Sequence, residues 1–467
     1  MPFPAESLPK TDILASAAAN TFFEPGKPVW VARAPGRLDV MGGNVDYTGG
    51  MVLQSLLREA VWAAVQPRDD DAIRILNPGA AAFGWKTHLE LKVGDLRGPQ
   101  ELRLLSEHDP ALRWSCYVLG ALYFLKQYRR WGKQGGVNLF LASDLPPNKG
   151  VSSSAALEVA TLKAASAAQG DSLEGIALAT AGQWVENVVV GAACGIMDQA
   201  AIVLGEEDRL LPILCQPCQP FPSVTLPEGV QIWGIDSMVS RSTTGAAYER
   251  ARAAAFLGYK LICLREGIDM VPEEVDGIPR WTDLRWNGYL SNLTPSEFRS
   301  SYERWLPETI TGREFVACAG EHVDPFTEID LGTEYPVRAA VRYAVEENFR
   351  VRTVNTLLGI EWDDSEDTLR LVGELLCQSH GAYAECGLGS EACDELVARA
   401  LKAGFPGAKM TGGGAGGVVA ILGRSEDRSA IHRIAQEYAA GRSAIPHIFE
   451  GSSNGAEVFG VRALQHS

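Results

Sequence analysis

The spacing of apolar positions predicts a strand pair near the N-terminus and a helix after it. Residues 28–34, 59–66 and 138–142 mix β-branched, aromatic and small side chains over strand-like lengths, and a Gly-rich segment separates the first two. A loop at 143–154 then leads into the Ala-rich run 155–168, which has high helix propensity. We therefore expect a hairpin around a functional loop, followed by a strand, a second loop and a helix.

A Pro-rich stretch at 212–227 interrupts this pattern, and we place a domain boundary there. The expected N-terminal domain is 1–226, and the expected C-terminal domain is 227–467. Within the C-terminal domain, residues 266–335 are irregular, polar and rich in Trp and Pro, which indicates an insertion with short helices.

The remaining segments predict an α+β arrangement, because helices and strands alternate in the C-terminal part. The expected helices are 172–190, 246–265, about 366–385 and about 391–403, and the expected strands are 230–236, about 417–423 and about 456–462.

Composition narrows the class of protein. A chain of 467 residues with 46% apolar and 21% charged residues is typical of a folded protein with two domains. The formal charge of −16 argues against a nucleic-acid or anionic-membrane partner, so an anion site would need backbone N–H groups. Nine scattered cysteines indicate reduced thiols, and the sequence has neither an 18-residue apolar run nor a signal-like start. We therefore expect a cytoplasmic protein.

Two Gly-rich segments have candidate chemistry. Residues 34–50 hold Arg37 and Asp46 among small neighbours that allow close approach to a ligand, although a surface hairpin with a salt bridge is the alternative. Residues 146–160 pass from a Pro–Pro pair through one glycine and three serines into the Ala-rich helix. Free N–H groups and hydroxyls at such a helix start can bind an anion, with Lys149 beside it. A Ser-capped helix without a ligand is the alternative here.

The third segment, residues 409–419, has glycine at five of the six positions 412–417. Ordering so many glycines costs conformational entropy, which favours close backbone approach to a ligand over a purely structural loop. The sequence has no GxxxxGK[ST] motif, so this segment would bind a nucleotide in a different way from a P-loop. Two carboxylates, Glu186 and Asp198, precede it. Phosphoryl transfer needs one carboxylate for Mg²⁺ and another near the attacking hydroxyl, so the chain must turn within 191–195 to bring both into one site.

Together these segments resemble the three signature motifs of the GHMP kinases, the family of galactokinase, homoserine kinase and mevalonate kinase. The segment APGRLDVMGGNVDYTGG at 34–50 resembles the sugar-recognition segment of the galactokinase branch, and CGIMDQ at 194–199 is similar to its catalytic segment. The resemblance covers about 28–460. It implies a two-domain α+β fold, in which a domain like domain 2 of ribosomal protein S5 precedes a ferredoxin-like domain, and it implies ATP, Mg²⁺ and a small-molecule sugar as ligands.

The resemblance also implies roles for individual residues. Asp198 matches the base at the sugar hydroxyl, Arg37 matches the cation that steadies it, and Ser154 and Glu186 match the Mg²⁺ ligands. The implied phosphate loop consists of Lys149, Gly150, Val151, Ser152, Ser153, Ser154 and Ala155. The implied sugar pocket consists of Gly43, Asn44, Asp46, Cys194, Gly195, Tyr248 and Gly413.

Two positions depart from the galactokinase pattern. Gly43 and Asn44 stand where galactokinases usually carry Glu and His, whose side chains face the hydroxymethyl end of the hexose. Asn148 and Lys149 stand where many have glycines, so Lys149 is a candidate to reach a phosphate directly. These variants, with CGLGS at 386–390, look most like plant-type L-arabinokinases, which implies L-arabinose as substrate and L-arabinose 1-phosphate as product.

Other functions remain open at this point. A kinase for galactose, N-acetylgalactosamine or a uronic acid is one alternative. A sensor that binds sugar and ATP without turnover is another, although such sensors tend to have lost residues from the serine loop, which is complete here. The sequence does not decide between a monomer and a homodimer.

Overall fold

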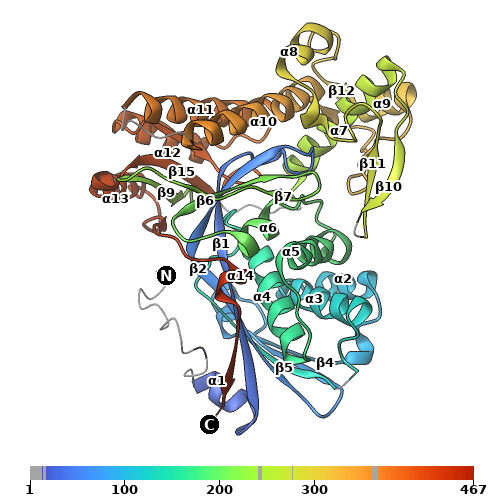
Figure 1. Cartoon of the computed structure of the whole chain (residues 1–467), viewed down its shortest axis with the longest axis vertical. Helices are drawn as coiled ribbons and strands as arrows, with labels where there is room; N and C mark the ends of the chain where they lie inside the picture. The colour runs from blue at the N-terminus through green and yellow to red at the C-terminus, as the bar shows by residue number, and fades with distance from the viewer. Residues whose placement is uncertain are drawn as a thin grey trace.

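The computed structural model describes residue 13 and residues 17–133, 135–239, 245–275, 277–359 and 366–466. It has two main sheets with helices packed on each (Figure 1). Of the helices in these ranges, none is long and apolar enough to cross a membrane. All nine cysteines are free thiols, as the sequence predicts.

The first sheet is built around a long hairpin, which confirms the predicted strand pair. Its strands lie in the order β17 (Val461–Gln465), β1 (Pro28–Met41), β2 (Met51–Pro67), β5 (Val137–Ser143), β3 (Ala72–Leu76) and β4 (His88–Lys92). On the other edge of β2 lies β6 (Arg209–Leu214), which also pairs with β7 (Gln219–Pro220) and β8 (Val224–Thr225). Strands β1 and β2 pair antiparallel, with Trp30 opposite Val65, and the Gly-rich loop 42–50 connects them.

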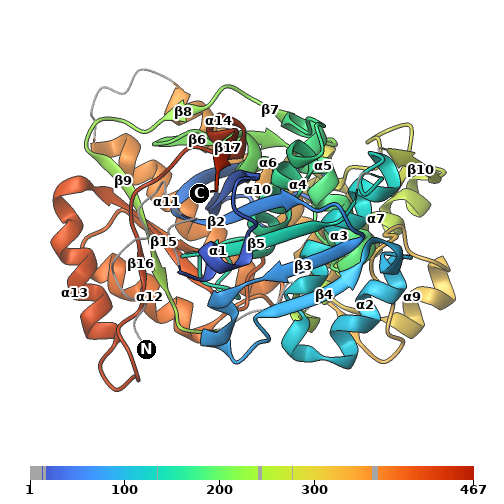
Figure 2. The ribbon, with the colours of Figure 1, turned by 90° about the horizontal axis from the view of Figure 1, so that it is seen from below.

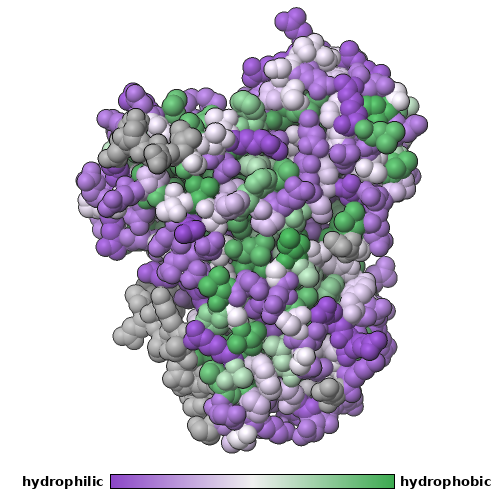
Figure 3. All heavy atoms as spheres, in the orientation of Figure 1, coloured by the Kyte–Doolittle hydropathy of each residue, from purple (hydrophilic) through white to green (hydrophobic). Residues whose placement is uncertain are grey.

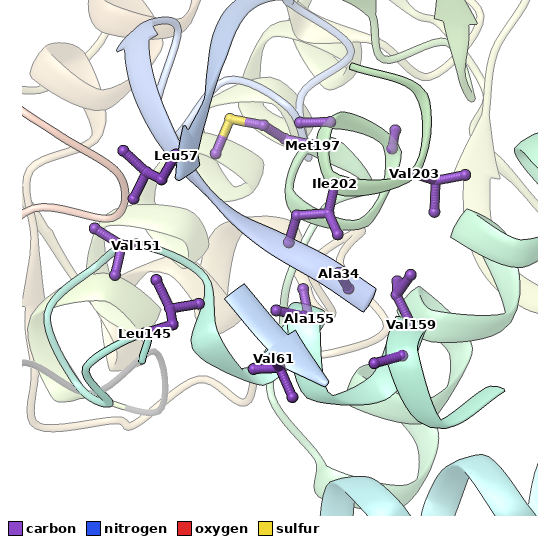
Figure 4. Packing of buried hydrophobic residues seen from close by; sticks show 14 of the residues in the cluster. Ala34, Leu57, Val61, Leu145, Val151, Ala155, Val159, Met197, Ile202 and Val203 are labelled. Atoms are coloured by element: carbon purple, nitrogen blue, oxygen red, sulfur yellow. The ribbon is translucent and has the colours of Figure 1, made fainter. Parts of the chain in front are cut away.

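Helices cover one face of this sheet (Figure 2). They are α2 (Pro99–His108), α3 (Ser115–Tyr128), α4 (Ser153–Ala168), α5 (Gly175–Trp184) and α6 (Met197–Leu204), while α1 (Ala17–Phe22) precedes the sheet. Helices α4 and α6 pack on β1 and β2, and α3 and α5 pack in turn on α4. Figure 4 shows the core beneath the second Gly-rich segment, where Leu145, Val151 and Ala155 lie among buried residues of β1, β2 and α6.

The second sheet lies in the C-terminal half. Its strands are β14 (Gly407–Met410), β15 (Val418–Arg424), β9 (Val230–Asp236) and β16 (Ile448–Phe449), in that order. The surrounding helices are α7 (Ala246–Glu266), α10 (Val337–Gly359), α11 (Glu366–Glu385), α12 (Glu391–Lys402) and α13 (Arg428–Tyr438). The long helix α10 was not predicted; it packs against both α7 and α11.

Residues 266–335 form short elements, as expected. They include a hairpin of β10 (Val271–Val275) and β11 (Ile278–Thr282), the short helices α8 (Pro295–Glu297) and α9 (Gly312–Ala319), and β12 (Ile310–Thr311), which pairs with β13 (Glu334–Tyr335). Their apolar side chains form a core of their own with α7 and α10. In Figure 3, hydrophilic residues cover most of this part of the visible face, and hydrophobic residues gather nearer the middle of the molecule.

Two predicted elements are wrong in their bounds. The helix expected at 172–190 begins at Gly175 and changes at Val185–Val190 into a π-helical turn that ends at Gly191, whose φ is 81°. The strand expected at 456–462 is the short helix α14 (Ala456–Phe459), followed by β17. Strand β17 returns to the first sheet and pairs with β1, so tertiary pairing rather than local propensity determines its position.

Candidate active site

The structure brings Arg37 and Asp198 together from opposite ends of the first half of the chain. Arg37 lies on β1 with 1% of its surface exposed, and Asp198 lies in the first turn of α6. Arg37 Nε and Nη2 donate to Asp198 Oδ1 at 2.9 and 2.7 Å, and Nη1 donates to the carbonyl of Gly150 at 2.7 Å. A guanidinium with three such bonds has little freedom to move.

The second Gly-rich segment wraps around the same carboxylate. Gly150 and Ser152 both adopt left-handed backbone conformations, with φ of 75° and 59°, immediately before α4 begins at Ser153. Ser152 Oγ donates to Asp198 Oδ2. The first N–H groups of α4 have no partner within the helix, so they remain available to an anion at its positive end. Ala155 is buried in the same first turn.

The turn predicted at 191–195 does bring Glu186 to this region. Ser154 Oγ donates to Glu186 Oε1 at 3.1 Å, and Gln199 Nε2 donates to Glu186 Oε2 at 2.8 Å. Burial, together with the charge of Asp198, raises the pKa of Glu186 to about 7. Glu186 is therefore a carboxylate whose charged form would gain from a nearby cation.

The Ser154 and Glu186 pair fits the donor set of a hard cation. A hydroxyl and a carboxylate are the oxygen ligands that Mg²⁺ accepts, and Mg²⁺ usually takes only one or two carboxylates from the protein and completes its shell with water and phosphate oxygens. Within the described ranges there is no group of three or more His, Cys, Asp and Glu side chains that could hold a metal by itself. The pair is thus suited to a cation that arrives with a nucleotide.

Asp46 lies in the loop between β1 and β2 and is 9% exposed. A Cβ atom at Gly195 would stand 2.1 Å from Asp46 Oδ2, so only glycine lets this carboxylate approach the segment before α6. Burial, with a further contribution from the charge of Asp198, raises the pKa of Asp46 to about 6. Beside it, the Cys194 amide donates to Asn187 Oδ1 at 3.0 Å.

Tyr248, from the first turn of α7, meets the same loop. Its ring makes an edge contact with Tyr47 at a centroid distance of 6.0 Å. Burial raises the pKa of the Tyr248 hydroxyl well above its usual range, so this hydroxyl is a neutral hydrogen-bonding group. The structure therefore brings Asp46, Cys194, Gly195 and Tyr248 to one region.

Gly43 and Asn44 differ in backbone conformation and in what surrounds their side-chain positions. Gly43 lacks the positive φ that would by itself require glycine; instead, a Cβ atom there would stand 2.1 Å from Tyr383 Oη and 2.5 Å from the carbonyl oxygen of Gly412. Tyr343 Oη donates to the Gly43 carbonyl at 2.6 Å. Asn44 has a φ of 61° and is 4% exposed, and neither atom of its side-chain amide has a hydrogen-bond partner among the described residues.

Lys149 forms an ion pair with Asp236 at the end of β9, with Nζ 2.9 Å from Oδ2. Its ammonium is therefore already paired in this structure. Gly413 is buried in the loop between β14 and β15, and Ser153 is the first residue of α4. No specific contact distinguishes these last two among the described interactions.

Sequence reasoning missed a buried carboxyl beside the site. Glu158 on α4 is fully buried, and its Oε2 accepts a hydrogen bond from Gln199 Nε2 at 3.2 Å. Burial raises the pKa of Glu158 well above its usual range and so favours the neutral form of this carboxyl. Its four-residue spacing from Ser154 on one helix face was the available signal. Gln199 thus bridges Glu158 and Glu186.

Comparison with known families identifies three matching segments. Residues 116–206 match the GHMP kinases N terminal domain, residues 365–440 match the GHMP kinases C terminal model, and residues 19–67 match the galactokinase galactose-binding signature.

Proteins of similar sequence agree with these family matches. The chain is 35% identical to L-arabinokinase from Arabidopsis thaliana over 98% of its own length, but it spans only 49% of that protein. It is 29% identical to galactokinase from Streptomyces coelicolor over 91% of this chain and 92% of that one.

Solved structures share the fold. Lactococcus lactis galactokinase, in complex with galactose, superposes with a TM-score of 0.70 at 21% identity over 94% of this chain and 95% of that one. The Methanococcus jannaschii mevalonate kinase superposes with a TM-score of 0.57 at 14% identity over 91% and 98% of the two chains. The predicted α+β fold with two characteristic domains is confirmed.

Proposed function

Because the chain belongs to the GHMP kinase family and carries the galactokinase signature, we propose that it transfers the γ-phosphoryl group of ATP to the anomeric hydroxyl of L-arabinose. The products are L-arabinose 1-phosphate and ADP. The sugar 1-kinase chemistry rests on the assembled Arg37 and Asp198 pair beside a serine loop. The choice of sugar rests on Gly43.

In this proposal Asp198 accepts the proton of the sugar hydroxyl as its oxygen attacks the γ-phosphorus. The bond from phosphorus to the bridging β–γ oxygen breaks, and ADP leaves with that oxygen. Arg37 holds the Asp198 carboxylate in one orientation through two bonds to Oδ1. Positioning and electrostatic stabilisation supply most of the rate in such reactions, because the transition state is loose.

The phosphates lie, in this proposal, at the N-terminus of α4. Residues 150–155 present N–H groups and serine hydroxyls there, so the overall charge of −16 does not prevent anion binding. Ser154 and Glu186 would hold Mg²⁺, which neutralises charge on the phosphates when bound. The complete serine loop and the assembled carboxylates support an enzyme over a sensor.

Gly43 is the observation that carries the substrate assignment. L-Arabinopyranose has the ring stereochemistry of D-galactopyranose with hydrogen in place of the hydroxymethyl group. A pocket for L-arabinopyranose needs no acidic side chain where the hydroxymethyl group of galactose would lie. A buried polar group without a partner there would cost roughly 1–3 kcal/mol. In this structure Tyr383 Oη and the Gly412 carbonyl fill the space that a side chain at position 43 would take.

Galactose is the second candidate, favoured by the match of residues 19–67 to the galactose-binding signature. A sugar panel with ATP and Mg²⁺ decides between the two. We expect kcat/KM for L-arabinose to exceed that for D-galactose, D-galacturonate and N-acetylgalactosamine. A preference for galactose would overturn the substrate, and the absence of ADP formation with every sugar would overturn the enzyme assignment.

A further inference from the structure

A cavity of about 140 Å³ lies between the candidate sugar residues and the 266–335 insertion. One side of it is formed by Asp46, Cys194 and Gly195. The other side is formed largely by residues of the insertion, among them Ile278, Trp281, Pro325 and Phe326. The insertion, for which the sequence suggests no role, is therefore part of the wall of this cavity.

Arg252 lines the same cavity from α7 and is 3% exposed. Its Nε and Nη2 donate to the two oxygens of Asp324 at 2.7 and 2.8 Å. The guanidinium also lies over the rings of Tyr47, Phe256 and Phe326, at 4.9, 5.5 and 5.5 Å from their centroids. Arg252 is thus fixed by a fork-shaped ion pair and by three aromatic contacts.

The third guanidinium nitrogen of Arg252 is different. Nη1 is buried and has no hydrogen-bond partner in the part of the chain that the structure describes. A buried N–H group that lacks a partner is unfavourable, and for a charged group the cost is larger. Since the other two nitrogens are occupied by Asp324, a group inside the cavity is the natural acceptor for Nη1.

The charges around the cavity indicate what kind of group this is. Two acids, Asp46 and Asp324, and two bases, Arg252 and Arg280, line it, so the lining is neutral overall. A neutral polyol matches that balance better than an anion does. Hydroxyl groups both donate and accept, so neighbouring hydroxyls of one sugar can satisfy a carboxylate and a guanidinium side by side.

We propose that Arg252 is a further sugar-binding residue, whose Nη1 donates a hydrogen bond to a ring hydroxyl of the sugar next to one that donates to Asp46. Asp324 of the insertion is then the positioning residue that holds Arg252 in place. This inference rests on the proposed function, because it takes the cavity beside Asp46 as part of the sugar site. It also assigns a function to the insertion.

Calorimetry tests this assignment. The sugar and a non-hydrolysable ATP analogue are titrated separately into the wild type and into each variant. The sugar is L-arabinose, or the sugar of the panel that the wild type phosphorylates. An ammonium cannot keep both the Asp324 fork and the third bond, so Arg252→Lys should weaken sugar binding about tenfold or more. Asp324→Asn should weaken it several-fold. Both variants should bind the ATP analogue within twofold of wild type.

Arg265→Lys is the matched control. Arg265 also belongs to α7 and also stacks on an aromatic ring, that of Trp305 at 4.7 Å, but it does not line the cavity. The Arg265→Lys variant should bind the sugar with the same affinity as the wild type. Equal sugar affinity in a folded Arg252→Lys protein would overturn the proposal.

Deoxy sugars supply a second measurement that does not depend on one variant folding. The 2-, 3- and 4-deoxy forms are titrated into wild type and Asp324→Asn. For the sugar that lacks the Arg252 partner, the wild type should lose affinity, and Asp324→Asn should cause little further loss. Full additivity for all three deoxy sugars would overturn the proposal. If the wild type phosphorylates no sugar, the proposed function fails instead.

Discussion

Arg37 holds one oxygen of Asp198 with two of its nitrogens, Nε at 2.9 Å and Nη2 at 2.7 Å, while Ser152 Oγ donates to the other oxygen. Both carboxylate oxygens are thus oriented before any substrate is bound. The third guanidinium nitrogen holds the Gly150 carbonyl, so one buried arginine connects the carboxylate to the serine loop.

Asp198→Asn should lower kcat by about 10²–10⁴-fold, because an amide cannot take up the hydroxyl proton although it has nearly the same volume. Its thermal unfolding should remain cooperative. Asp171→Asn is the control, since Asp171 makes a similar two-bond pair with Arg129 on the surface. Wild-type turnover in Asp198→Asn, measured by ADP release, would contradict the assigned role.

Arg37→Lys should also lower kcat by at least about 10²-fold, since one ammonium cannot reproduce the planar fork to Asp198 and the bond to Gly150. The comparison is Arg129→Lys, which weakens only exposed contacts, with Asp171 and with the Ser172 carbonyl, and should leave kcat near wild type. If both lysine variants turn over equally, Arg37 contributes nothing beyond its charge.

Glu186→Gln should raise the Mg²⁺ concentration needed for half-maximal activity while leaving sugar affinity within about twofold, because an amide is a poorer ligand for a hard cation. The measurement is ADP release against Mg²⁺ at fixed ATP, with sugar affinity from calorimetry. An unchanged Mg²⁺ dependence would mean that Glu186 only supports the contacts of Ser154 and Gln199.

Sugar binding should weaken as pH falls through about 6, the value to which burial and the charge of Asp198 raise the pKa of Asp46. Arg252 opposes that rise. An ionised Asp46 accepts hydrogen bonds from the sugar hydroxyls, so the sugar Kd should be about tenfold higher at pH 5 than at pH 7. Asp46→Asn should bind weakly at both pH values and show no such slope.

The contribution of Asp46 to stability should change with pH in the opposite sense to sugar binding. The folded pKa of Asp46 lies above the ordinary value of 3.8, so its contribution to stability is complete below about pH 4 and is lost as pH rises through about 6. Asp46→Asn should therefore gain stability relative to wild type between pH 5 and 7, measured by denaturant unfolding. A buried carboxylate retained at a cost to stability is expected at a functional site.

The sequence predicts the elements around the site better than it predicts contacts between distant segments. Glycine and serine content identifies the three loops, because glycine adopts a positive φ such as that of Gly150 without strain and lets the backbone approach a ligand closely. Lys149, by contrast, pairs with Asp236 across 87 positions of the chain, which no local pattern reveals. The return of β17 to β1 has the same cause, since pairing partners are set by the tertiary fold.

Long-range packing also changes how Gly43 is understood. Its φ is not positive, so turn geometry does not require glycine there. The requirement comes from Tyr383, on α11, and from Gly412 in the third loop. Tyr383 Oη donates to the Gly412 carbonyl at 2.6 Å and stands where a Cβ atom of residue 43 would begin.

Tyr383→Phe should therefore raise the kcat/KM ratio of D-galactose to L-arabinose several-fold, because it removes the nearest of the atoms that fill the space next to Gly43. D-Fucose carries a methyl group where D-galactose carries its hydroxymethyl group. Its kcat/KM relative to that of L-arabinose should rise as well if the size of this substituent limits activity. Tyr343→Phe is the control: it removes the bond to the Gly43 carbonyl without opening that space, so it should affect the three sugars alike. A Gly43→Glu/Asn44→His variant in the wild-type background should unfold at lower temperature and gain no galactose activity, since Tyr383 Oη would lie 2.1 Å and the Gly412 carbonyl oxygen 2.5 Å from the new Cβ atom. If instead that double variant folds normally and prefers galactose, Tyr383 and Gly412 can move aside, and the size limit lies elsewhere in the pocket.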